Sequence, residues 1–308
     1  FVVGQNSYPL VMADWTRREF GYSNNINVPT NDSAKPTISI TLSGNFTGTL
    51  EKTFEILPKE IKEGLFFVVD QTEELQDTMT SISPNLSNAT YTGAVQNKAV
   101  AVYQKFVLED GSVEYRRITQ INTGNNDLPN FKLNYLSRII DNPTESDYAV
   151  NVGSAFVKVT GQNNYTGSIY SFFSIEPLDI QVALDKWIAE GTEASSSGRI
   201  KLDNYIQKVT IDDDITAYKF NAEATYSGDV IIPTFALSLL VGDSSIALQK
   251  RATINSNGDY YVGVLKGCVD VNSVNVLYVT GYGNFTGTAY LSFDISPTPA
   301  LPLVSYEI

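Results

Sequence analysis

The sequence contains no histidine, and this absence excludes several kinds of active site. Histidine is the commonest general base and metal ligand near neutral pH. Without it, neither a Ser/His/Asp triad nor a Cys/His pair can be built within the chain. The sequence also has no phosphate-cradling glycine loop and no set of zinc ligands. We therefore expect a protein without enzymatic activity and without a cofactor.

Cysteine and long apolar runs are equally scarce. Cys268 is the single cysteine, so no disulfide can form within the chain. Its apolar context, YVGVLKGCVDV, favours a small buried hydrophobic residue over a reactive thiol. A helix that spans a membrane needs a run of about 18 apolar residues, and the sequence has none, so we expect no membrane span. The opening FVVGQNSYPL lacks a Met and a signal-peptide pattern, which favours a processed product or a piece of a longer protein.

Charge and composition indicate a folded, acidic β-protein. The 308 residues include 34 acidic and 21 basic side chains, a formal net charge of −13. This charge would repel nucleic-acid phosphates and anionic lipids, so we expect no nucleic-acid partner. Hydrophobic residues make up 43% and aromatic residues 11%, too many for a disordered chain. Because Asn, Thr, Ser, Gly, Val and Ile recur throughout, we expect short strands joined by turns, and an all-β fold.

A five-residue motif occurs three times, as GNFTG from Gly44, NNYTG from Asn163 and GNFTG from Gly283. The longer stretches TISITLSGNFTGTLEKTFEILP, AFVKVTGQNNYTGSIYSFFSIEP and VNVLYVTGYGNFTGTAYLSFDISP align around it. Separations of 119 and 120 residues relate four sets of landmarks: Asn45, Asn164 and Asn284; Phe54, Phe173 and Phe293; Ile56, Ile175 and Ile295; and Pro58, Pro177 and Pro297. So constant a period predicts tandem domains of about 120 residues.

Each copy of the motif predicts a β-hairpin, with alternating strands on both sides of a Gly/Asn/Thr turn. The expected first strands cover residues 37–43, 156–160 and 274–280. The last motif glycine supplies backbone freedom, and the motif Asn can bond its own backbone in the turn. We expect the motif aromatic to cap the end of a core, rather than to stack on carbohydrate, and the later Phe to lie inside the core. The structural positions assigned in this way are Asn45, Phe46, Gly48, Phe54, Asn164, Tyr165, Gly167, Phe173, Asn284, Phe285, Gly287 and Phe293.

A second set of words accompanies the motif. ATYTGAV begins at Ala89 and ATYSGDV at Ala224, while FGYSNNINV near the start matches SDYAVNVGSAFV ahead of the second motif. Together these words resemble the bacterial immunoglobulin-like (Big-type) repeats of Gram-positive surface proteins and of tailed-phage virion proteins. The resemblance covers residues 18–58, 89–177 and 224–297. It implies tandem immunoglobulin-like β-sandwiches in an extracellular protein. The units are longer than such repeats usually are, with the excess in residues 59–85 and 179–215.

The prolines after each closing strand predict the domain boundaries, because proline interrupts sheet pairing. We call residues 1–57 the first repeat, which lacks its N-terminal half, residues 58–176 the second and residues 177–296 the third. Residues 297–308 are interpreted as a linker or the first strand of a further unit. Within the third repeat, DIQVALDKWIAEG fits a short helix or a strand, and we favour a strand.

Few residues qualify as a chemical site. Asp212, Asp213 and Asp214 cluster carboxylates as a weak Ca²⁺ candidate, although an acidic turn is the better interpretation because the spacing of a calcium loop is missing. The carboxylates around Asp110 are interpreted as residues of a hairpin turn. Residues that could form an interface are Trp15, Arg17, Arg18 and Trp187, with core packing an equal alternative for the two tryptophans.

Two functions stay open at this point. The first is a non-enzymatic structural or adhesive module of a bacterial cell surface or phage virion, with protein partners, self-assembly or glycans. The alternative is a carbohydrate-binding or carbohydrate-active protein, recognisable by two carboxylates in a cleft beside an exposed Trp. The half-complete first repeat also needs a cover for its apolar face. Either flanking sequence and residues 1–36 provide it, or the tail ALPLVSYEI of another copy adds a strand.

Overall fold

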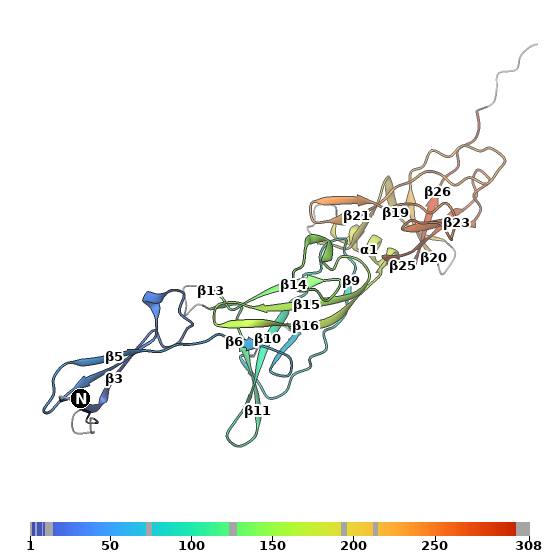
Figure 1. Ribbon diagram of the computed structural model, residues 1–308. Coiled ribbons are helices and arrows are strands. Elements are labelled where there is room, and N and C mark those ends of the chain that lie inside the picture. The colour runs from blue at the N-terminus through green and yellow to red at the C-terminus, as the bar shows by residue number, and fades with distance from the viewer. Residues whose placement is uncertain are drawn as a thin grey trace, which may run out of the picture. The chain divides into compact units, whose positions relative to one another are not determined.

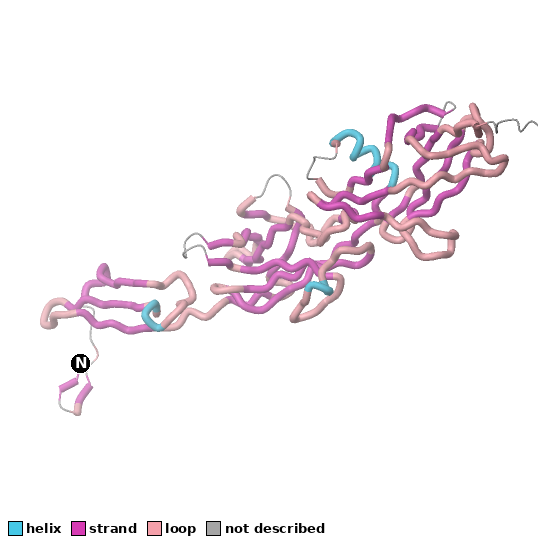
Figure 2. Tube along the Cα trace, turned by 90° about the horizontal axis from the view of Figure 1, so that it is seen from above, coloured by secondary structure: helices cyan, strands magenta, loops and turns pink. Residues whose placement is uncertain are grey.

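The computed structural model describes residues 2–3, 5–7, 9, 15–71, 76–122, 128–191, 196–211 and 215–299, and only the backbone of residues 2–3, 15–20 and 122. This part of the chain is built from β-strands in several sheets (Figure 1), with one α-helix. Figure 2 draws this helix in cyan, the colour also used there for two short 3-10 turns elsewhere in the chain. The all-β prediction is confirmed.

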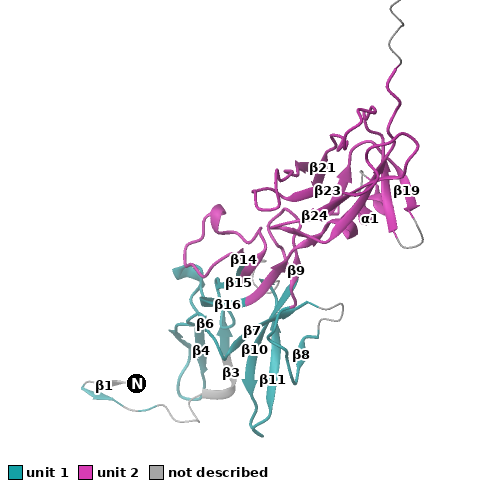
Figure 3. Cartoon of the chain, turned by 90° about the vertical axis from the view of Figure 1, so that its right-hand side faces the viewer, with its two compact units in different colours: residues 1–86, 99–134, 157–171 teal, residues 87–98, 135–156, 172–308 magenta. Residues whose placement is uncertain are grey.

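The chain divides into two compact units, shown in Figure 3. Compact unit 1 comprises residues 1–86, 99–134 and 157–171, and compact unit 2 comprises residues 87–98, 135–156 and 172–308. Three strands of one sheet contribute residues to both units: β14 (Phe131–Leu136), β15 (Gly153–Gly161) and β16 (Tyr165–Glu176). Since the second repeat is thus shared between the two units, the domain boundaries expected at the prolines stay a prediction.

Compact unit 1 contains the first repeat and part of the second. Its remaining elements are β1 (Val2–Val3), β2 (Asn6–Ser7), β3 (Trp15–Ser23), η2 (Asp32–Ala34), β4 (Thr37–Leu42), β5 (Thr49–Thr53), β6 (Lys59–Ile61), β7 (Phe66–Asp70), β8 (Thr78–Met79), β10 (Val100–Val107), β11 (Val113–Ile118), β12 (Ile121–Asn122) and β13 (Leu128–Pro129). They form the sheets β3-β4-β5 and β7-β10-β11-β8 and the pairs β1-β2 and β12-β13. Val69, Ala101 and Tyr103 of the four-stranded sheet form a buried cluster, and the partly buried Met79 and Tyr115 of the same sheet pack against it.

Compact unit 2 contains the third repeat. Its elements are β9 (Ala89–Thr90), η3 (Glu145–Asp147), β17 (Leu178–Asp179), α1 (Ile180–Glu190), β18 (Arg199–Leu202), β19 (Tyr205–Ile211), β20 (Ile215–Phe220), β21 (Leu237–Val241), β22 (Ser244–Ala247), β23 (Tyr260–Lys266), β24 (Asn275–Gly281), β25 (Phe285–Thr286) and β26 (Thr288–Phe293). A five-stranded sheet, β19-β20-β26-β24-β23, accompanies the three-stranded sheet β18-β21-β22. Aromatic rings pack in the core of compact unit 2: Phe220 contacts Phe235 and Phe293 at centroid distances of 5.4 and 6.1 Å.

The strand favoured for DIQVALDKWIAEG is wrong, because this segment forms helix α1. The buried residues Ile180, Ala183, Leu184 and Trp187 are spaced three and four apart, which is a helical stripe. Val182, which a strand interpretation counts as apolar, is 61% exposed. The helix has defined ends: the Asp179 carboxylate accepts a hydrogen bond from the Val182 N–H at 3.0 Å. At the other end Gly191 has a φ of 79°.

The three predicted hairpins are present, each in its own sheet. β4 pairs with β5, and β24 with β26, in antiparallel register. β15 lies next to β16. Each turn closes with the same backbone hydrogen bond, from Phe46 N to Ser43 O (3.3 Å), Tyr165 N to Gln162 O (3.1 Å) and Phe285 N to Tyr282 O (3.1 Å). The last motif glycines, Gly48, Gly167 and Gly287, have φ of 106°, 76° and 73°, so the predicted need for glycine is confirmed.

The later Phe of each motif does not have the same environment in all three repeats. Phe173 and Phe293 are 1% exposed, as a core assignment requires. Phe54 is 37% exposed, so its assignment to a core is wrong. Every residue of β5 is exposed as well. The reason is that Phe54 follows a sheet of only three strands, whereas β26 lies between two neighbours in a sheet of five.

Candidate functional site: the joint between consecutive repeats

Asn284 in the third hairpin bonds a loop of the second repeat, at residues 151 and 152. Its side-chain oxygen accepts a hydrogen bond from the Val152 N–H at 3.0 Å, and its amide nitrogen donates to Asn151 Oδ1 at 3.0 Å. All three residues belong to compact unit 2. One amide side chain therefore bonds both a backbone donor and a side-chain acceptor of the preceding repeat, across about 130 residues of sequence.

Asn164 in the second hairpin makes the same two bonds to the first repeat. Its side-chain oxygen accepts from the Val28 N–H at 2.8 Å, and its amide nitrogen donates to Asn27 Oδ1 at 2.7 Å. These residues all lie in compact unit 1. The chain thus builds one arrangement twice: the side chain of a hairpin Asn hydrogen-bonds both residues of an Asn–Val pair in the repeat before it. We call each arrangement a joint.

The short strand after each boundary proline also pairs with the hairpin of its own repeat. β6 pairs in parallel with β16, with Lys59 opposite Tyr165, and β17 pairs in parallel with β25, with Leu178 opposite Phe285. The backbone oxygens of the hairpin Asn residues accept from Lys59 N at 2.8 Å and from Leu178 N at 3.0 Å. Each hairpin Asn is therefore bonded through both its side chain and its backbone.

These strands lie so close to the hairpin that its last glycine has no room for a side chain. A Cβ on Gly167 would lie 2.8 Å from the Ile61 backbone oxygen, and one on Gly287 would lie 2.1 Å from Asp179 Oδ2. Asp179 is the residue that caps helix α1. The motif glycine of the third repeat is thus required by its φ and by a close approach at the same time.

An aromatic pair adds to the second joint. Tyr91, from the ATYTG word of the second repeat, contacts Phe285 of the third hairpin edge to face at a centroid distance of 5.4 Å. The Tyr91 side chain is 8% exposed. Burial, followed by the negative charge of Asp259, raises the pKa of Tyr91, while its hydrogen bond with Asn284 acts in the opposite direction. Edge-to-face aromatic contacts of this kind are worth about 0.5–1.5 kcal/mol beyond their buried area.

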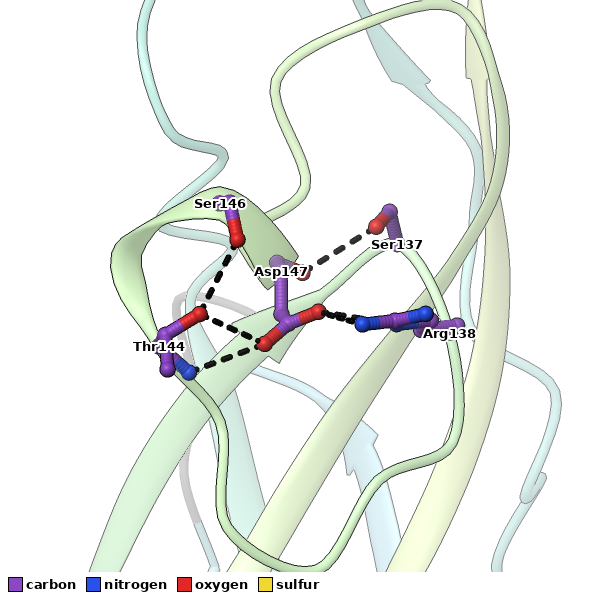
Figure 4. Close-up of polar contacts among 5 residues, drawn as sticks. All are labelled: Ser137, Arg138, Thr144, Ser146 and Asp147. Carbon is purple, nitrogen blue, oxygen red and sulfur yellow. Dashed lines mark hydrogen bonds and ion pairs between the residues drawn. The ribbon is translucent and has the colours of Figure 1, made fainter.

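The loop that carries Asn151 is itself held by a buried carboxylate, shown in Figure 4. Asp147, 3% exposed, accepts hydrogen bonds from the Thr144 N–H and hydroxyl, both at 2.9 Å, and from Arg138 Nε at 2.8 Å. The Ser137 hydroxyl donates to the Asp147 backbone oxygen at 3.1 Å. These bonds, with those from Thr144 first, lower the pKa of the Asp147 carboxyl. The carboxylate positions the η3 turn just ahead of the Asn–Val pair.

The corresponding loop of the first repeat is bordered by two hollows in compact unit 1. One, of about 380 Å³, is lined by residues 24–30 and Ala34. The other, of about 360 Å³, lies beside Asn27, Arg117, Asn130 and Asn164. Their linings hold neutral amides and a single cation, with no acidic side chain among the named residues. Such a lining offers hydrogen bonds, and the phenol of Tyr165, which also lines the second hollow, is its one group of a kind used in acid–base catalysis among the named residues.

Several residues predicted from sequence lie outside the described structure. They are the calcium candidates Asp212, Asp213 and Asp214, and the side chains of Trp15, Arg17 and Arg18. Among the residues that are described, no group of three or more acidic, Cys or His side chains could hold a metal ion. The described helices include none with the length and apolar character needed to cross a membrane.

The other sequence interpretations are placed by the structure. Trp187 is 9% exposed on α1 and contacts Tyr205 at a centroid distance of 5.5 Å, so it packs in the core rather than at an interface. Cys268 is fully buried, as predicted, and burial raises the pKa of its thiol. The Asp110 carboxylate accepts from the Ser112 N–H and hydroxyl at 2.9 and 2.6 Å, which confirms a turn residue.

Sequence reasoning missed what the motif Asn does. The expectation was a hydrogen bond to its own turn, whereas Asn164 and Asn284 bond the preceding repeat. A signal was present: FGYSNNINV and SDYAVNV each end in an Asn–Val pair ahead of a motif. The motif Asn and the Asn–Val pair thus recur together in the sequence. Two features that recur together are what a contact repeated at each boundary would produce.

A scan against family models and searches of curated proteins and of solved structures found nothing that matches this chain.

Proposed function

We propose that this chain is a non-enzymatic structural module, in which tandem immunoglobulin-like β-sandwich repeats act as a spacer or adhesive face of an extracellular assembly. The assembly is a bacterial cell surface or a phage virion. In this function the joints hold consecutive repeats in a fixed relation, and the surfaces between joints are available to partners.

The observation that carries the proposal is the joint formed twice with the same chemistry. A spacer needs the same rigid connection at each boundary, while an enzyme needs one site of unique composition. The two joints use equivalent residues 120 apart, Asn164 and Asn284, with amide bonds of 2.7–3.0 Å. Neutral amide bonds do not depend on salt or on pH near neutrality, which suits a protein that works outside the cell.

The immunoglobulin-like fold and the extracellular setting are supported by the sequence words GNFTG, ATYTG and the Asn–Val segments, which resemble Big-type repeats. Antiparallel hairpins in separate sheets, described above, are compatible with such sandwiches. The carbohydrate alternative is less favoured, since its expected mark was an exposed Trp beside two carboxylates. Trp187, the one tryptophan whose side chain is described, is buried.

Small-angle X-ray scattering tests the proposal. We expect the double variant Asn164→Ala/Asn284→Ala to keep its strands by circular dichroism and to show a wider distribution of maximum dimensions, because both joints lose two hydrogen bonds. The matched control is Asn221→Ala/Asn255→Ala, which removes two exposed asparagines outside the joints. Identical scattering from the wild-type protein and both double variants would show that the joints do not fix the repeats, and would overturn the spacer function.

A further inference from the structure

The hollow beside Asn27 and Asn164 crosses the first joint. Its volume is about 360 Å³, and its polar lining consists of Asn27 from the first repeat and Arg117, Thr119, Asn130, Asn164 and Tyr165 from the second. All of these residues belong to compact unit 1. Ligand pockets have volumes of about 300–1,000 Å³, so this hollow has room for a small ligand. We call it the Arg117 hollow.

Arg117 brings an unpaired positive charge to this hollow. The residue is half-buried, and its guanidinium has no ion pair or hydrogen bond among the described residues. Its neighbour on β11, Arg116, pairs with Glu114, and the Arg116 guanidinium lies 4.4 Å from the centroid of the Phe106 ring. Because successive side chains of a strand point to opposite faces, the two arginines have different surroundings. Arg117 is the one that lines the hollow.

Two further groups of the lining are available for hydrogen bonds. The Tyr165 ring contacts Phe66 edge to face at a centroid distance of 5.9 Å, but within the described part of the chain its hydroxyl has no hydrogen bond. The Asn130 amide nitrogen donates to the Thr119 backbone oxygen at 2.9 Å, while the Asn130 side-chain oxygen accepts no bond from a described residue. The hollow therefore offers a cation, a hydroxyl and an amide oxygen to a ligand.

The second joint has a carboxylate at the position of Asn130. Asn130 N donates to Gln120 O, and in the third repeat Asp259 N donates to Gln249 O, both at 2.7 Å. The backbone oxygens of Asn130 and Asp259 each accept from the residue two before the hairpin Asn, at 2.8 and 2.9 Å. The negative charge of Asp259 repels an anion. The two joints thus share their hairpin bonds but differ in the charge beside them.

We propose that the Arg117 hollow binds an acidic sugar residue of a glycan, with the sugar carboxylate on the Arg117 guanidinium and sugar hydroxyls on Tyr165 and Asn130. The parallel N–H groups of a guanidinium match the two oxygens of a carboxylate. Amide and hydroxyl groups match sugar hydroxyls, which both donate and accept. The inference rests on the proposed adhesive function and deepens it by naming the ligand class of one adhesive site.

The charge of the chain favours a ligand with a single negative charge. The formal net charge is −13, so a polyanion such as a nucleic acid or a heavily sulfated glycan is repelled. One unpaired cation among neutral groups balances one carboxylate. The acidic side chain of a peptide would use the arginine and leave the amide and phenol groups without partners, which favours the sugar.

A ligand in this hollow also stabilises the first joint. Asn27 and Asn164 are hydrogen-bonded to each other and both line the hollow, so opening of the joint takes the site apart. A ligand that binds only the closed joint stabilises it by mass action. We therefore expect slower amide exchange at Val28, whose N–H donates to Asn164, and no change at Val152 in the second joint.

An NMR titration with sodium glucuronate as the probe tests the site. We expect saturable shifts of the Thr119 and Asn130 amide signals, and about tenfold slower exchange at Val28 when the probe is at ten times its dissociation constant. Glucose lacks the carboxylate and acetate lacks the sugar ring, so each should bind about tenfold more weakly or worse. The proposal is overturned by the absence of saturable shifts up to about 100 mM glucuronate, or by acetate or inorganic phosphate binding equally well.

The adjacent arginines provide matched variants. Arg117→Gln should weaken glucuronate binding about tenfold or more, and Tyr165→Phe about fivefold, because each removes hydrogen bonds to the ligand. Arg116→Gln should leave binding unchanged, since this side chain does not line the hollow. Equal losses in the two arginine variants would show attraction to positive charge in general and would contradict the inference. A protein that binds no glucuronate keeps its spacer function if the joint variants still broaden the scattering, so the two proposals fail separately.

Discussion

The hairpins of the first and third repeats share the words GNFTG but have very different surroundings. Both turn with the same hydrogen bond, and both have a motif glycine with positive φ. In the third repeat the hairpin strand has a parallel neighbour, β20, on its other side, and Phe293 is 1% exposed. In the first repeat β5 ends a sheet of three strands, and Phe54 is 37% exposed. Local sequence determines the hairpin, and elements far away in the sequence determine its burial.

The largest expected effect comes from removing the equivalent phenylalanines. Phe293→Ala should lower the free energy of unfolding by about 3–5 kcal/mol, because it empties a fully buried ring position. Phe54→Ala should cost less than about 1 kcal/mol, since its ring already contacts water. Urea unfolding followed by circular dichroism measures both. Equal losses would mean that the first hairpin has a hidden cover in solution.

Tyr91 in ATYTGAV and Tyr226 in ATYSGDV, two equivalent sequence segments, provide the next comparison. Tyr91→Ala should cost about 2–4 kcal/mol, from lost burial and the lost edge-to-face contact with Phe285. Tyr226→Ala should change stability by no more than about 0.5 kcal/mol, as expected for an exposed side chain. Thermal melts of the two variants give the comparison. A large loss at Tyr226 would show that its surface is covered within one molecule.

The burial of Tyr91 also predicts a dependence on alkaline pH. Because the pKa of Tyr91 is raised in the folded protein, its contribution is fully present below the ordinary tyrosine pKa of about 10. It is lost as pH rises from there through the folded-state value. Tyr91→Phe should flatten the fall of melting temperature above about pH 10. Identical alkaline profiles for Tyr91→Phe and the wild-type protein would contradict the assignment.

Substitutions of two motif glycines distinguish the cost of backbone strain from the cost of a steric clash. Gly48→Ala should cost about 1–2 kcal/mol, because its φ of 106° strains any other residue but space is open. Gly287→Ala should cost about 2–3 kcal/mol, since the new methyl group also displaces Asp179 from the end of helix α1. Urea unfolding and the helical circular dichroism signal report both parts. If the two variants lost equal stability with α1 unchanged, the close approach would not exist.

The smallest effect concerns the carboxylate behind Asn151. The pKa of Asp147 is lowered, so its stabilisation is present above the ordinary Asp pKa of about 3.9 and is lost as pH falls through the folded value. Asp147→Asn should therefore lower the melting temperature at neutral pH and reduce its fall below about pH 4. Asp32→Asn, which removes an exposed ion pair with Lys35 in the first repeat, should leave the melting temperature at neutral pH unchanged. Equal melting temperatures of the two variants at neutral pH would refute the role of Asp147.

The sequence allowed the hairpins and the motif glycines to be predicted, because both depend on residues within a few positions of each other. Helix α1 was missed because Val182 was counted with the apolar face, although the spacing of Ile180, Ala183 and Leu184 is helical. Phe54 was misassigned because burial depends on strands beyond the hairpin, and the described sheet that carries this hairpin in the first repeat has three strands. The joint could not be derived from one hairpin, since Asn284 and Asn151 are 133 residues apart and only the fold brings them together.

Amide hydrogen exchange measured by NMR tests the joint most directly. The Val28 N–H donates to Asn164 and the Val152 N–H donates to Asn284, so each valine reports one joint. We predict that Asn164→Ala speeds exchange at Val28 alone and Asn284→Ala at Val152 alone, each about tenfold or more, which corresponds to about 1.4 kcal/mol of lost protection. If both valines exchanged at the wild-type rate in both variants, the hairpin asparagines would not connect the repeats, and the central claim would be wrong.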